Sequence, residues 1–340
     1  MENILTKLCS CITVSGTETV NQDLIKQLLP NGTLVESDNN GNIIATLGNE
    51  QSDNIILLDA HNDQIGLIVT YIDDNGFLKV SNCGGIDRRV LLGSTVTVKG
   101  KEDVMGIICC LPPHLSDGGE DKASSADSIY IDTGLSKSKV TEIISLGDRA
   151  VVSTTPRKLI KNRFTATGLD NKAGVATVIQ VAHLLSKENL NNCCVKLLFS
   201  CQEETGFLGS KTASFSISPK CAIVVDVSFA TQPGVSAEKC GIMSKGPMIG
   251  TAPILNKEIF NQLKSIANKE NIDYQIEVMS STTGTNADAI TISKGGVPTG
   301  LISIPLRNMH TQAEVIDISD IEKSAQLIAT FVKERGGCNE

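Results

Sequence analysis

The spacing of hydrophobic and polar positions changes twice along the chain. Residues 54–60, NIILLDA, form a short apolar run typical of a buried strand, and residues 66–165 show only short strands separated by turns. From about residue 168 onward, helical spacing alternates with strand-like runs such as VKLLFS, CAIVVDV and TGLISIP. Strands that alternate with helices predict an α/β sheet, so the pattern indicates an α/β unit interrupted by a β-rich segment.

These changes predict two domains. Residues 1–65 and 166–340 are expected to form an α/β domain with a mainly parallel sheet. Residues 66–165 are expected to form a β-rich, barrel-like insert that serves contact or access.

Two local patterns predict a hairpin turn and the start of a helix. The stretch LIVTYIDDNGFLKV indicates a hairpin, and its Asn75-Gly76 pair favours a type I′ turn. A C-terminal helix is predicted to begin at Ser319, with Glu322 completing a capping box.

Composition narrows the function classes. The formal net charge is -8 and no Lys/Arg cluster offsets it, so nucleic acid is not an expected partner. No apolar run approaches the roughly 20 residues that a membrane span needs. The 11 cysteines are odd in number and irregularly spaced, and the N-terminus lacks a signal-peptide pattern. Reduced thiols and a cytoplasmic location are therefore expected.

Residue types that bind metals occur beside the ends of predicted strands or before a predicted helix. Because ligands bind outside the carboxyl ends of the strands of open α/β sheets, these side chains are expected to share one cleft. They are His61 and Asp63 after 54–60, Asp170 before a long helix, Glu203 and Glu204 after 195–201, Asp226 at the end of 221–225, and His310 after 299–305.

The donor set predicts two divalent metal ions per subunit. His61, Asp170, Glu204, Asp226 and His310 offer nitrogen and oxygen without thiolate, which suits Zn²⁺, Co²⁺ or Mn²⁺. Two histidines and three carboxylates exceed the needs of one tetrahedral ion, and they serve a pair if one carboxylate bridges.

The acidic residues beside the predicted metal ligands are expected to have different roles. Asp63 lies two residues after His61, so on an extended chain it shares a face with His61 and can hold the imidazole ring. The adjacent side chains of Glu203 and Glu204 are expected to point apart, so one can bind metal while the other acts as general acid and base.

Each of these residues also has an ordinary interpretation when taken alone, as a surface histidine, a solvated acidic pair or a helix cap. His183 lies within a predicted helix and is expected to be structural, and His114 is expected to be structural or an oligomer contact. Cys201 is a weaker alternative, as a nucleophile, because no histidine lies near it in sequence.

Five blocks together resemble the dinuclear metalloaminopeptidases of the glutamyl aminopeptidase and deblocking aminopeptidase family. They are DAHNDQIGLIV at 59–69, GLDNKAGVA at 168–176, CQEETGFLGS at 201–210, VVDV at 224–227 and ISIPLRNMH at 302–310. The resemblance covers nearly the whole chain and implies a zinc-peptidase-like α/β/α sandwich. It also implies peptide substrates and a homo-oligomer, a tetrahedral dodecamer built from dimers.

The resemblance further implies a role for each site residue. His61 and Asp226 would hold one metal ion, Glu204 and His310 the other, and Asp170 would bridge them. Glu203 would be the general base, and Asp63 would orient His61.

Four positions, in three places, depart from the family pattern. Asn62 and Gln64 replace the usual Met and Glu around the first His-x-Asp, Asn308 replaces a Tyr, and Asn286 replaces an Asp. None removes a ligand or the base, but Asn286 and Asn308 are candidates for altering how the substrate is held.

The sequence therefore predicts an aminopeptidase that removes N-terminal residues from peptides, with a water held between two metal ions and Glu203 as general base. One alternative is a glycoside hydrolase of endoglucanase type that uses paired carboxylates such as Glu203 and Asp226. The absence of Trp and the histidine-rich ligand set count against it. The other alternative is a non-catalytic peptide- or metal-binding subunit.

Overall fold

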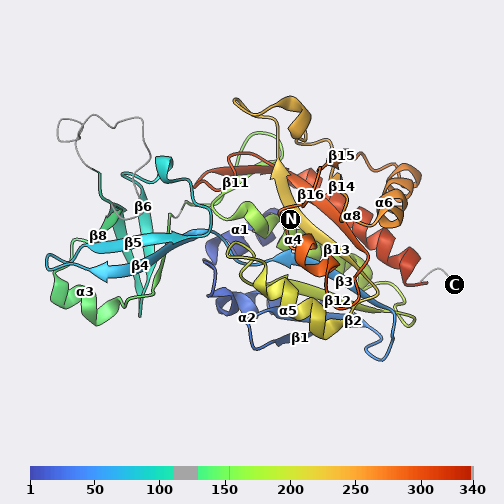
Figure 1. Ribbon diagram of the computed structural model, residues 1–340, viewed down its shortest axis with the longest axis horizontal. Helices are drawn as coiled ribbons and strands as arrows, with labels where there is room; N and C mark the ends of the chain where they lie inside the picture. The colour runs from blue at the N-terminus through green and yellow to red at the C-terminus, as the bar shows by residue number, and fades with distance from the viewer. Residues whose placement is uncertain (111–128, 153, 338–340) are drawn as a thin grey trace.

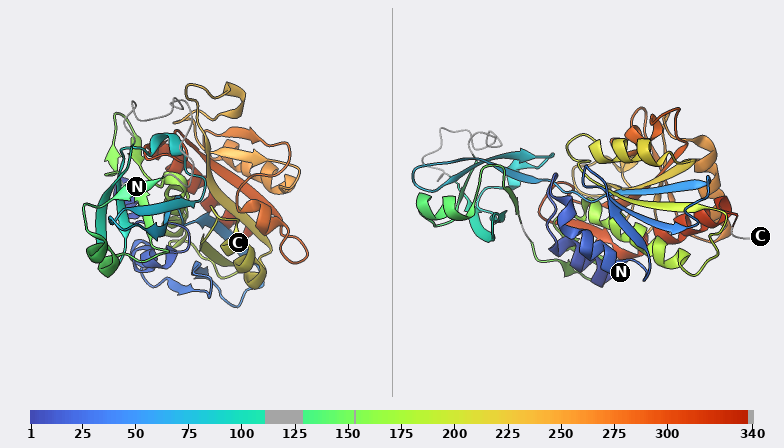
Figure 2. Two further views of the ribbon diagram at one scale, coloured as in Figure 1. Left: turned by 60° about the vertical axis from the view of Figure 1, so that its left-hand side comes forward. Right: turned by 90° about the horizontal axis from the view of Figure 1, so that it is seen from below.

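The computed structural model describes residues 1–110, 129–152 and 154–337, so His114 lies outside the described residues. Within them, eight strands form a central sheet and six form a closed barrel. The barrel lies to one side of the sheet and its helices, and the C-terminus lies at the opposite end of the molecule (Figures 1 and 2). The predicted α/β fold with a barrel-like insert is confirmed.

The central sheet is mixed, with four parallel strands in the middle and one further parallel pair at an edge. Strand β3 pairs in parallel with β12 and β13, and β13 pairs in parallel with β16. The strand order is β1 (Leu34–Ser37), β2 (Ile43–Gly48), β12 (Cys194–Ser200), β3 (Ile55–His61), β13 (Cys221–Phe229), β16 (Thr299–Leu306), β14 (Met248–Thr251) and β15 (Gln275–Val278).

Helices cover both faces of this sheet, which explains why its central strands are apolar throughout. On β3, the side chains of Ile56 and Leu58 pack into the core beneath one set of helices, and Leu57 packs into the core on the opposite face. The first face carries α1 (Glu2–Ser10), α2 (Gln22–Leu28), α4 (Leu169–Leu185), α6 (Lys257–Lys269) and α8 (Ile318–Arg335), and the second carries α5 (Leu208–Ile217) and α7 (Ala287–Thr291). A strand buried on both faces gains no benefit from alternating polarity.

The barrel has its own apolar core, and all its strand pairs are antiparallel. Its strands follow the order β4 (Gly66–Ile72), β5 (Leu78–Cys83), β8 (Tyr130–Asp132), β7 (Asp103–Ile108), β6 (Thr95–Lys99) and β9 (Arg149–Val152), with α3 (Lys137–Ile143) nearby in the chain.

The β4–β5 hairpin is confirmed, but the type I′ turn is wrong. Of the pair Asn75-Gly76, only Gly76 has a positive φ angle, +93°. The Gly76 amide donates to the carbonyl of Asp73, and the Asp73 side chain accepts from the amides of Asn75 and Phe77. The side chain of Asp73 thus stabilises a longer turn that needs one left-handed residue.

A small third sheet joins the segment after the barrel to the C-terminal region. It contains β10 (Arg157–Lys158), β11 (Arg163–Ala166) and β17 (Glu314–Asp317). Helix α8 follows β17 directly, and its N-cap is Asp317, whose carboxylate accepts from the Ser319 amide at 2.9 Å. The predicted start at Ser319 with a Glu322 capping box is therefore wrong, because Asp317 supplies the acceptor earlier.

Short 3₁₀ segments complete the fold, at Glu18–Asn21, Arg88–Val90 and Ala237–Lys239. Among the described residues, no helix combines the length and apolar character that crossing a membrane requires.

Candidate active site

The candidate site lies at the carboxyl edge of the parallel strands. His61 is the last residue of β3, and its parallel partner on β12 is Ser200, after which the chain leads to Glu203 and Glu204. His310 follows four residues after β16 ends. Neighbouring parallel strands that end together thus bring these residues to one edge, as predicted.

Asp226 differs in one respect from the prediction. It was expected at the end of a strand over 221–225, but β13 continues to Phe229. The extension is stabilised by parallel pairing that reaches Phe229 and Leu306. Asp226 therefore projects from within a strand, which fixes its backbone more firmly than a loop position would.

The carboxylate of Asp170 lies between the two histidines. Its Oδ1 is 3.1 Å from Nε2 of His61, and its Oδ2 is 3.2 Å from Nε2 of His310. Asp170 stands at the start of α4, where its φ and ψ angles are not helical and its peptide bond to Asn171 is cis. The structure thus places one carboxylate oxygen against each imidazole.

The remaining carboxylates lie on either side of Asp170. Oδ1 of Asp226 is 3.6 Å from Nε2 of His61, and Oε1 of Glu204 is 3.6 Å from Nε2 of His310. Potential ligand atoms of His61, Asp170 and Asp226 all lie within 4.8 Å of one another, and so do those of Asp170, Glu204 and His310. The two triads share Asp170.

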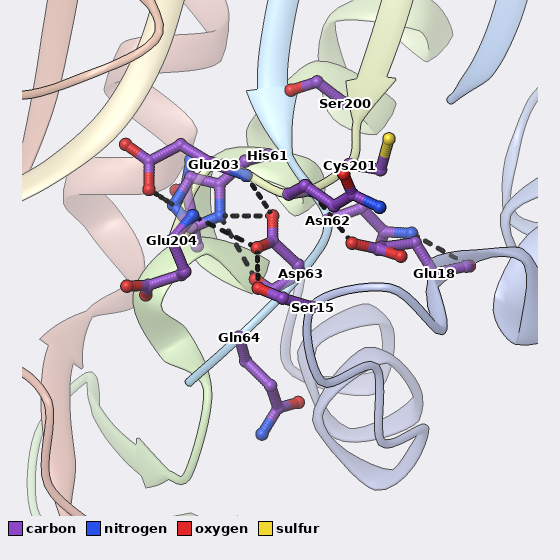
Figure 3. Close-up of polar contacts among 12 residues, drawn as sticks. Ser15, Glu18, His61, Asn62, Asp63, Gln64, Ser200, Cys201, Glu203 and Glu204 are labelled. Atoms are coloured by element: carbon purple, nitrogen blue, oxygen red, sulfur yellow. Dashed lines mark hydrogen bonds and ion pairs between the residues drawn. The ribbon is translucent and has the colours of Figure 1, made fainter. Parts of the chain in front are cut away.

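Asp63 contacts both His61 and the segment that carries the two glutamates (Figure 3). Its carboxylate is 3.4 Å from Nδ1 of His61 and accepts from the amides of Glu203 at 3.0 Å and Glu204 at 3.2 Å. The carbonyl oxygen of Asp63 is also 3.1 Å from Nδ1 of His61. The side chains of Glu203 and Glu204 extend in different directions (Figure 3), although the two residues lie in a bend and a turn and not on extended backbone.

Glu314 is a buried residue that the sequence analysis missed. Its Oε2 accepts from the amide of Asp170 at 3.1 Å, and its Oε1 accepts from the amide of His310 at 3.0 Å. One side chain therefore ties the backbone of the central carboxylate to that of the second histidine. Its position four residues after His310, in the short strand β17, offered only a weak signal.

The loop that leaves the barrel after β5 also reaches the site. Nδ1 of His310 donates to the carbonyl of Gly85 at 2.9 Å, and the amide of Asp87 donates to the carbonyl of His310 at 3.3 Å. A Cβ atom on Gly85 would lie 3.0 Å from Nδ1 of His310, so the close approach favours glycine. The barrel side of the molecule thus orients one histidine.

The electrostatics of the site suit a divalent cation. Burial is the main cause that raises the pKa of Glu203 to about 9 and that of Glu204 to about 9, and it also raises the pKa of Asp226. Burial lowers the pKa of His61, but the carboxylates of Glu203 and Asp226 outweigh it and raise that pKa well above its usual value. Oε1 of Glu204 is buried and accepts no hydrogen bond from any residue that the structure describes. Crowded acidic groups with an unused oxygen fit a bound cation that compensates their charge.

Other residues singled out from the sequence lie apart from this cluster. Sγ of Cys201 donates to the carbonyl of Asn40, and burial raises the pKa of the thiol to about 12, which removes it as a nucleophile. Nδ2 of the buried Asn286 donates to Asp59 and Ser200. Asn308 is exposed, and its side chain donates to the carbonyl of Ala313. His183 contacts the carbonyl of Leu28, in keeping with a structural role.

A cavity of about 490 Å³ opens on the cluster. Its wall combines the acidic and histidine side chains with apolar groups from Phe207, Phe229 and Met309, and with Ser228 and Thr283. This volume lies in the range of pockets that hold small molecules or the end of a peptide.

A mainly parallel α/β sheet with a buried histidine, a partly buried histidine and several carboxylates at its carboxyl edge is typical of metal-dependent hydrolases. The chain belongs to the M42 glutamyl aminopeptidase family, whose model matches residues 41–327. It is therefore an aminopeptidase and a metallopeptidase, as the resemblance implied.

Similar proteins match along nearly the whole chain. The lysyl aminopeptidase of Pyrococcus furiosus is 31% identical and aligns over 97% of this chain and 96% of its own length. The aminopeptidase APDkam598 of Desulfurococcus kamchatkensis is 32% identical, with a TM-score of 0.90 and coverage of 98% of this chain and 94% of that one. The TET1 peptidase of Pyrococcus horikoshii is 30% identical, with a TM-score of 0.84 and coverage of 97% and 98%.

Proposed function

We propose that the chain removes N-terminal residues from peptides, with Glu203 as general base and two divalent cations at the cluster around Asp170. The observation that carries this proposal is the position of Asp170, whose two carboxylate oxygens lie 3.1 and 3.2 Å from the two histidines. A carboxylate that lies between two histidines can serve as a ligand shared by two metal ions.

Each ion would have its own ligands. His61 and Asp226 would hold one divalent cation, Glu204 and His310 the other, and Asp170 would be shared. When bound, such ions polarise a scissile carbonyl and make a water more acidic. Zn²⁺ and Co²⁺ fit this all-nitrogen and oxygen donor set best, and Mn²⁺ also fits.

Glu203 carries the proton transfers in this proposal. It takes a proton from the attacking water as the carbon–oxygen bond forms, and returns the proton to the leaving amine nitrogen as the carbon–nitrogen bond breaks. Its backbone is held for this task, because the amide of Glu203 donates to Asp63. Asp63 also orients His61, so it acts as a positioning residue.

The cavity supports an aminopeptidase better than a glycoside hydrolase. Its wall offers apolar side chains for an N-terminal residue, including Phe207, Phe229 and Met309. Trp, a side chain on which sugar-binding clefts commonly stack their ligands, is absent from the chain. Assays on aminoacyl-anilides and on soluble glucan, each with and without chelator, test the two functions directly.

Removal of metal is expected to abolish peptide hydrolysis, because five ligand side chains converge where three would hold one ion. Exhaustive chelation should stop turnover, and Zn²⁺ or Co²⁺ should restore it. Elemental analysis of the active protein should give two ions per chain. Full activity with one ion, or with none, contradicts the two-ion site.

The second part of the proposal concerns assembly. The TET1 peptidase of Pyrococcus horikoshii assembles into a tetrahedron or a large octahedral shell. In the present chain, barrel strand β7 exposes Met105 by 71% and Ile107 by 46%. Exposed apolar side chains on one strand face suit contact with another subunit. We therefore propose a homo-oligomer, a tetrahedral dodecamer of twelve chains built from dimers, that works in the cytoplasm.

An assembly of this kind is expected to have a mass about twelve times the 36.1 kDa of the chain. Light scattering coupled to size exclusion measures this mass. Enclosed sites should also hydrolyse short peptides in preference to the N-termini of folded proteins. A fully active monomer would refute the assembly and leave the metal site unaffected.

A further inference from the structure

The segment Ser15-Gly16-Thr17-Glu18 lies against the two loops that carry the site, although it is distant from both in sequence (Figure 3). Strand pairing brings it there, because Val14 forms an isolated parallel bridge with Gln64 and the amide of Ser15 donates to the carbonyl of Gln64 at 3.3 Å. The segment therefore runs beside the residues that follow His61.

Three consecutive backbone amides, in the loop of residues 202–204 that carries Glu203, donate to buried carboxylates. The amide of Gln202 donates to Oε1 of Glu18 at 2.9 Å, and the next two amides, of Glu203 and Glu204, donate to Asp63 at 3.0 and 3.2 Å. Gln202 has a φ angle of +55°, a conformation that a non-glycine residue adopts at a cost. The carboxylate of Glu18 therefore holds the backbone amide of Gln202, the residue directly before the proposed general base Glu203.

Glu18 is itself held rigidly for this contact. It is 2% exposed, and its Oε1 also accepts from the amide of Gly16 at 2.9 Å. Gly16 has a φ of +88°, and a Cβ atom there would lie 3.0 Å from Nη2 of Arg149, so glycine suits this turn. The hydroxyl of Ser15 donates to Oδ2 of Asp63, so the same segment fixes both carboxylate acceptors.

We infer that Glu18 is a positioning residue for the reaction. It accepts a hydrogen bond from the backbone amide of Gln202 and thereby fixes the position of the adjacent Glu203. This inference rests on the proposed function, in which Glu203 is the general base. Glu18 does not line the cavity, so its effect passes through the loop and not through contact with substrate. Its role depends on an accepting oxygen at this place and not on its charge.

Two substitutions separate these properties. Glu18→Ala removes the acceptor, and it is expected to lower kcat by roughly 10- to 100-fold with little change in KM, since displacement of a catalytic group by about 1 Å can cost about 10²-fold. Glu18→Gln keeps a carbonyl oxygen, and it should retain activity within about threefold of wild type. If Glu18→Ala does not fold, Glu18→Asp can replace it, because the shorter side chain withdraws the acceptor oxygen from the amide of Gln202. Its kcat is then compared with that of Glu18→Gln.

Asp320 offers a matched control. Its buried carboxylate also accepts two backbone amides, from Ser244 at 2.7 Å and Gly246 at 2.8 Å, and neither of these residues lines the cavity. Asp320→Ala and Glu18→Ala should both lower the melting temperature, but Asp320→Ala should leave kcat close to wild type. A fall in kcat of equal size in both variants would reduce Glu18 to a structural role and overturn the inference.

Hydrogen exchange provides a readout that needs neither metal nor turnover. In the metal-free protein, Glu18→Ala should speed exchange in the peptide that contains residues 202–204, whereas Asp320→Ala and Glu18→Gln should not. Unchanged exchange in that peptide, or a Glu18→Gln variant as inactive as Glu18→Ala, would overturn the inference. Absence of aminopeptidase activity in the wild type would instead refute the proposed function, while the exchange comparison would still test the loop contact.

Discussion

Glu203→Gln is expected to lower kcat by at least roughly 10²-fold, the lower end of what a general base contributes. The amide side chain keeps nearly the same size but cannot accept the proton of the attacking water. Because the backbone amide of Glu203 still donates to Asp63, the loop should keep its position. Metal content and substrate affinity should therefore stay close to wild type, as measured by elemental analysis and by binding of an uncleaved peptide analogue.

Glu204→Gln is the control for this experiment, since it makes the same chemical change at the adjacent position. Glu204 has an oxygen 3.6 Å from His310, and this oxygen accepts no hydrogen bond within the described residues. The variant should weaken one metal site and lose activity through that loss. Equal loss of metal in both variants would show that the two glutamates do not have separate roles.

Asp170→Asn is expected to weaken both metal sites at once and to reduce activity at least as much as Glu203→Gln. Its carboxylate lies between His61 and His310, so replacement by an amide removes a negative charge from both triads. Elemental analysis and titration with Zn²⁺ or Co²⁺ should show weaker binding of both ions.

Variants on either side of Asp170 test whether it is shared. Asp226→Asn should weaken mainly the site at His61, and Glu204→Gln mainly the site at His310, because in the two triads that contain Asp170 each residue groups with that histidine. Potential ligand atoms of Glu203 and Glu204 also lie within 4.8 Å of one of His61, so the size of the effect at each site has to be measured separately. Retention of one full-affinity ion in Asp170→Asn would assign this carboxylate to a single site.

The sequence predicted the parts of the site that depend on where strands end. His61 and Glu203 follow apolar runs that form the parallel neighbours β3 and β12, and Asp170 begins a long helix. Once a parallel sheet is inferred, its carboxyl edge brings such residues together. The same logic gave the α/β fold, because the period of hydrophobic positions reports which faces are buried.

The sequence did not predict the residues that hold the site in place from a distance. Glu314 and Glu18 are single acidic residues in short elements. Their carboxylates accept hydrogen bonds from backbone amides far away in the chain, those of Asp170 and Gln202 respectively. Hydrophobic spacing carries no information about such contacts, because they depend on the three-dimensional path of loops. The N-cap at Asp317 was missed for a local reason, since a competing pattern at Ser319 and Glu322 lay only two residues further on.

The loop from β5 that holds His310 bears on how such proteins can be recombined. The carbonyl of Gly85 orients the imidazole, and at the other margin of the barrel Nε of Arg149 donates to the carbonyl of Ser15 at 3.1 Å. A chimaera that exchanged the barrel as a self-contained module would thus also replace two contacts of the catalytic centre. Transplantation would have to keep both of these contacts, so barrel and sheet have to be engineered as one unit.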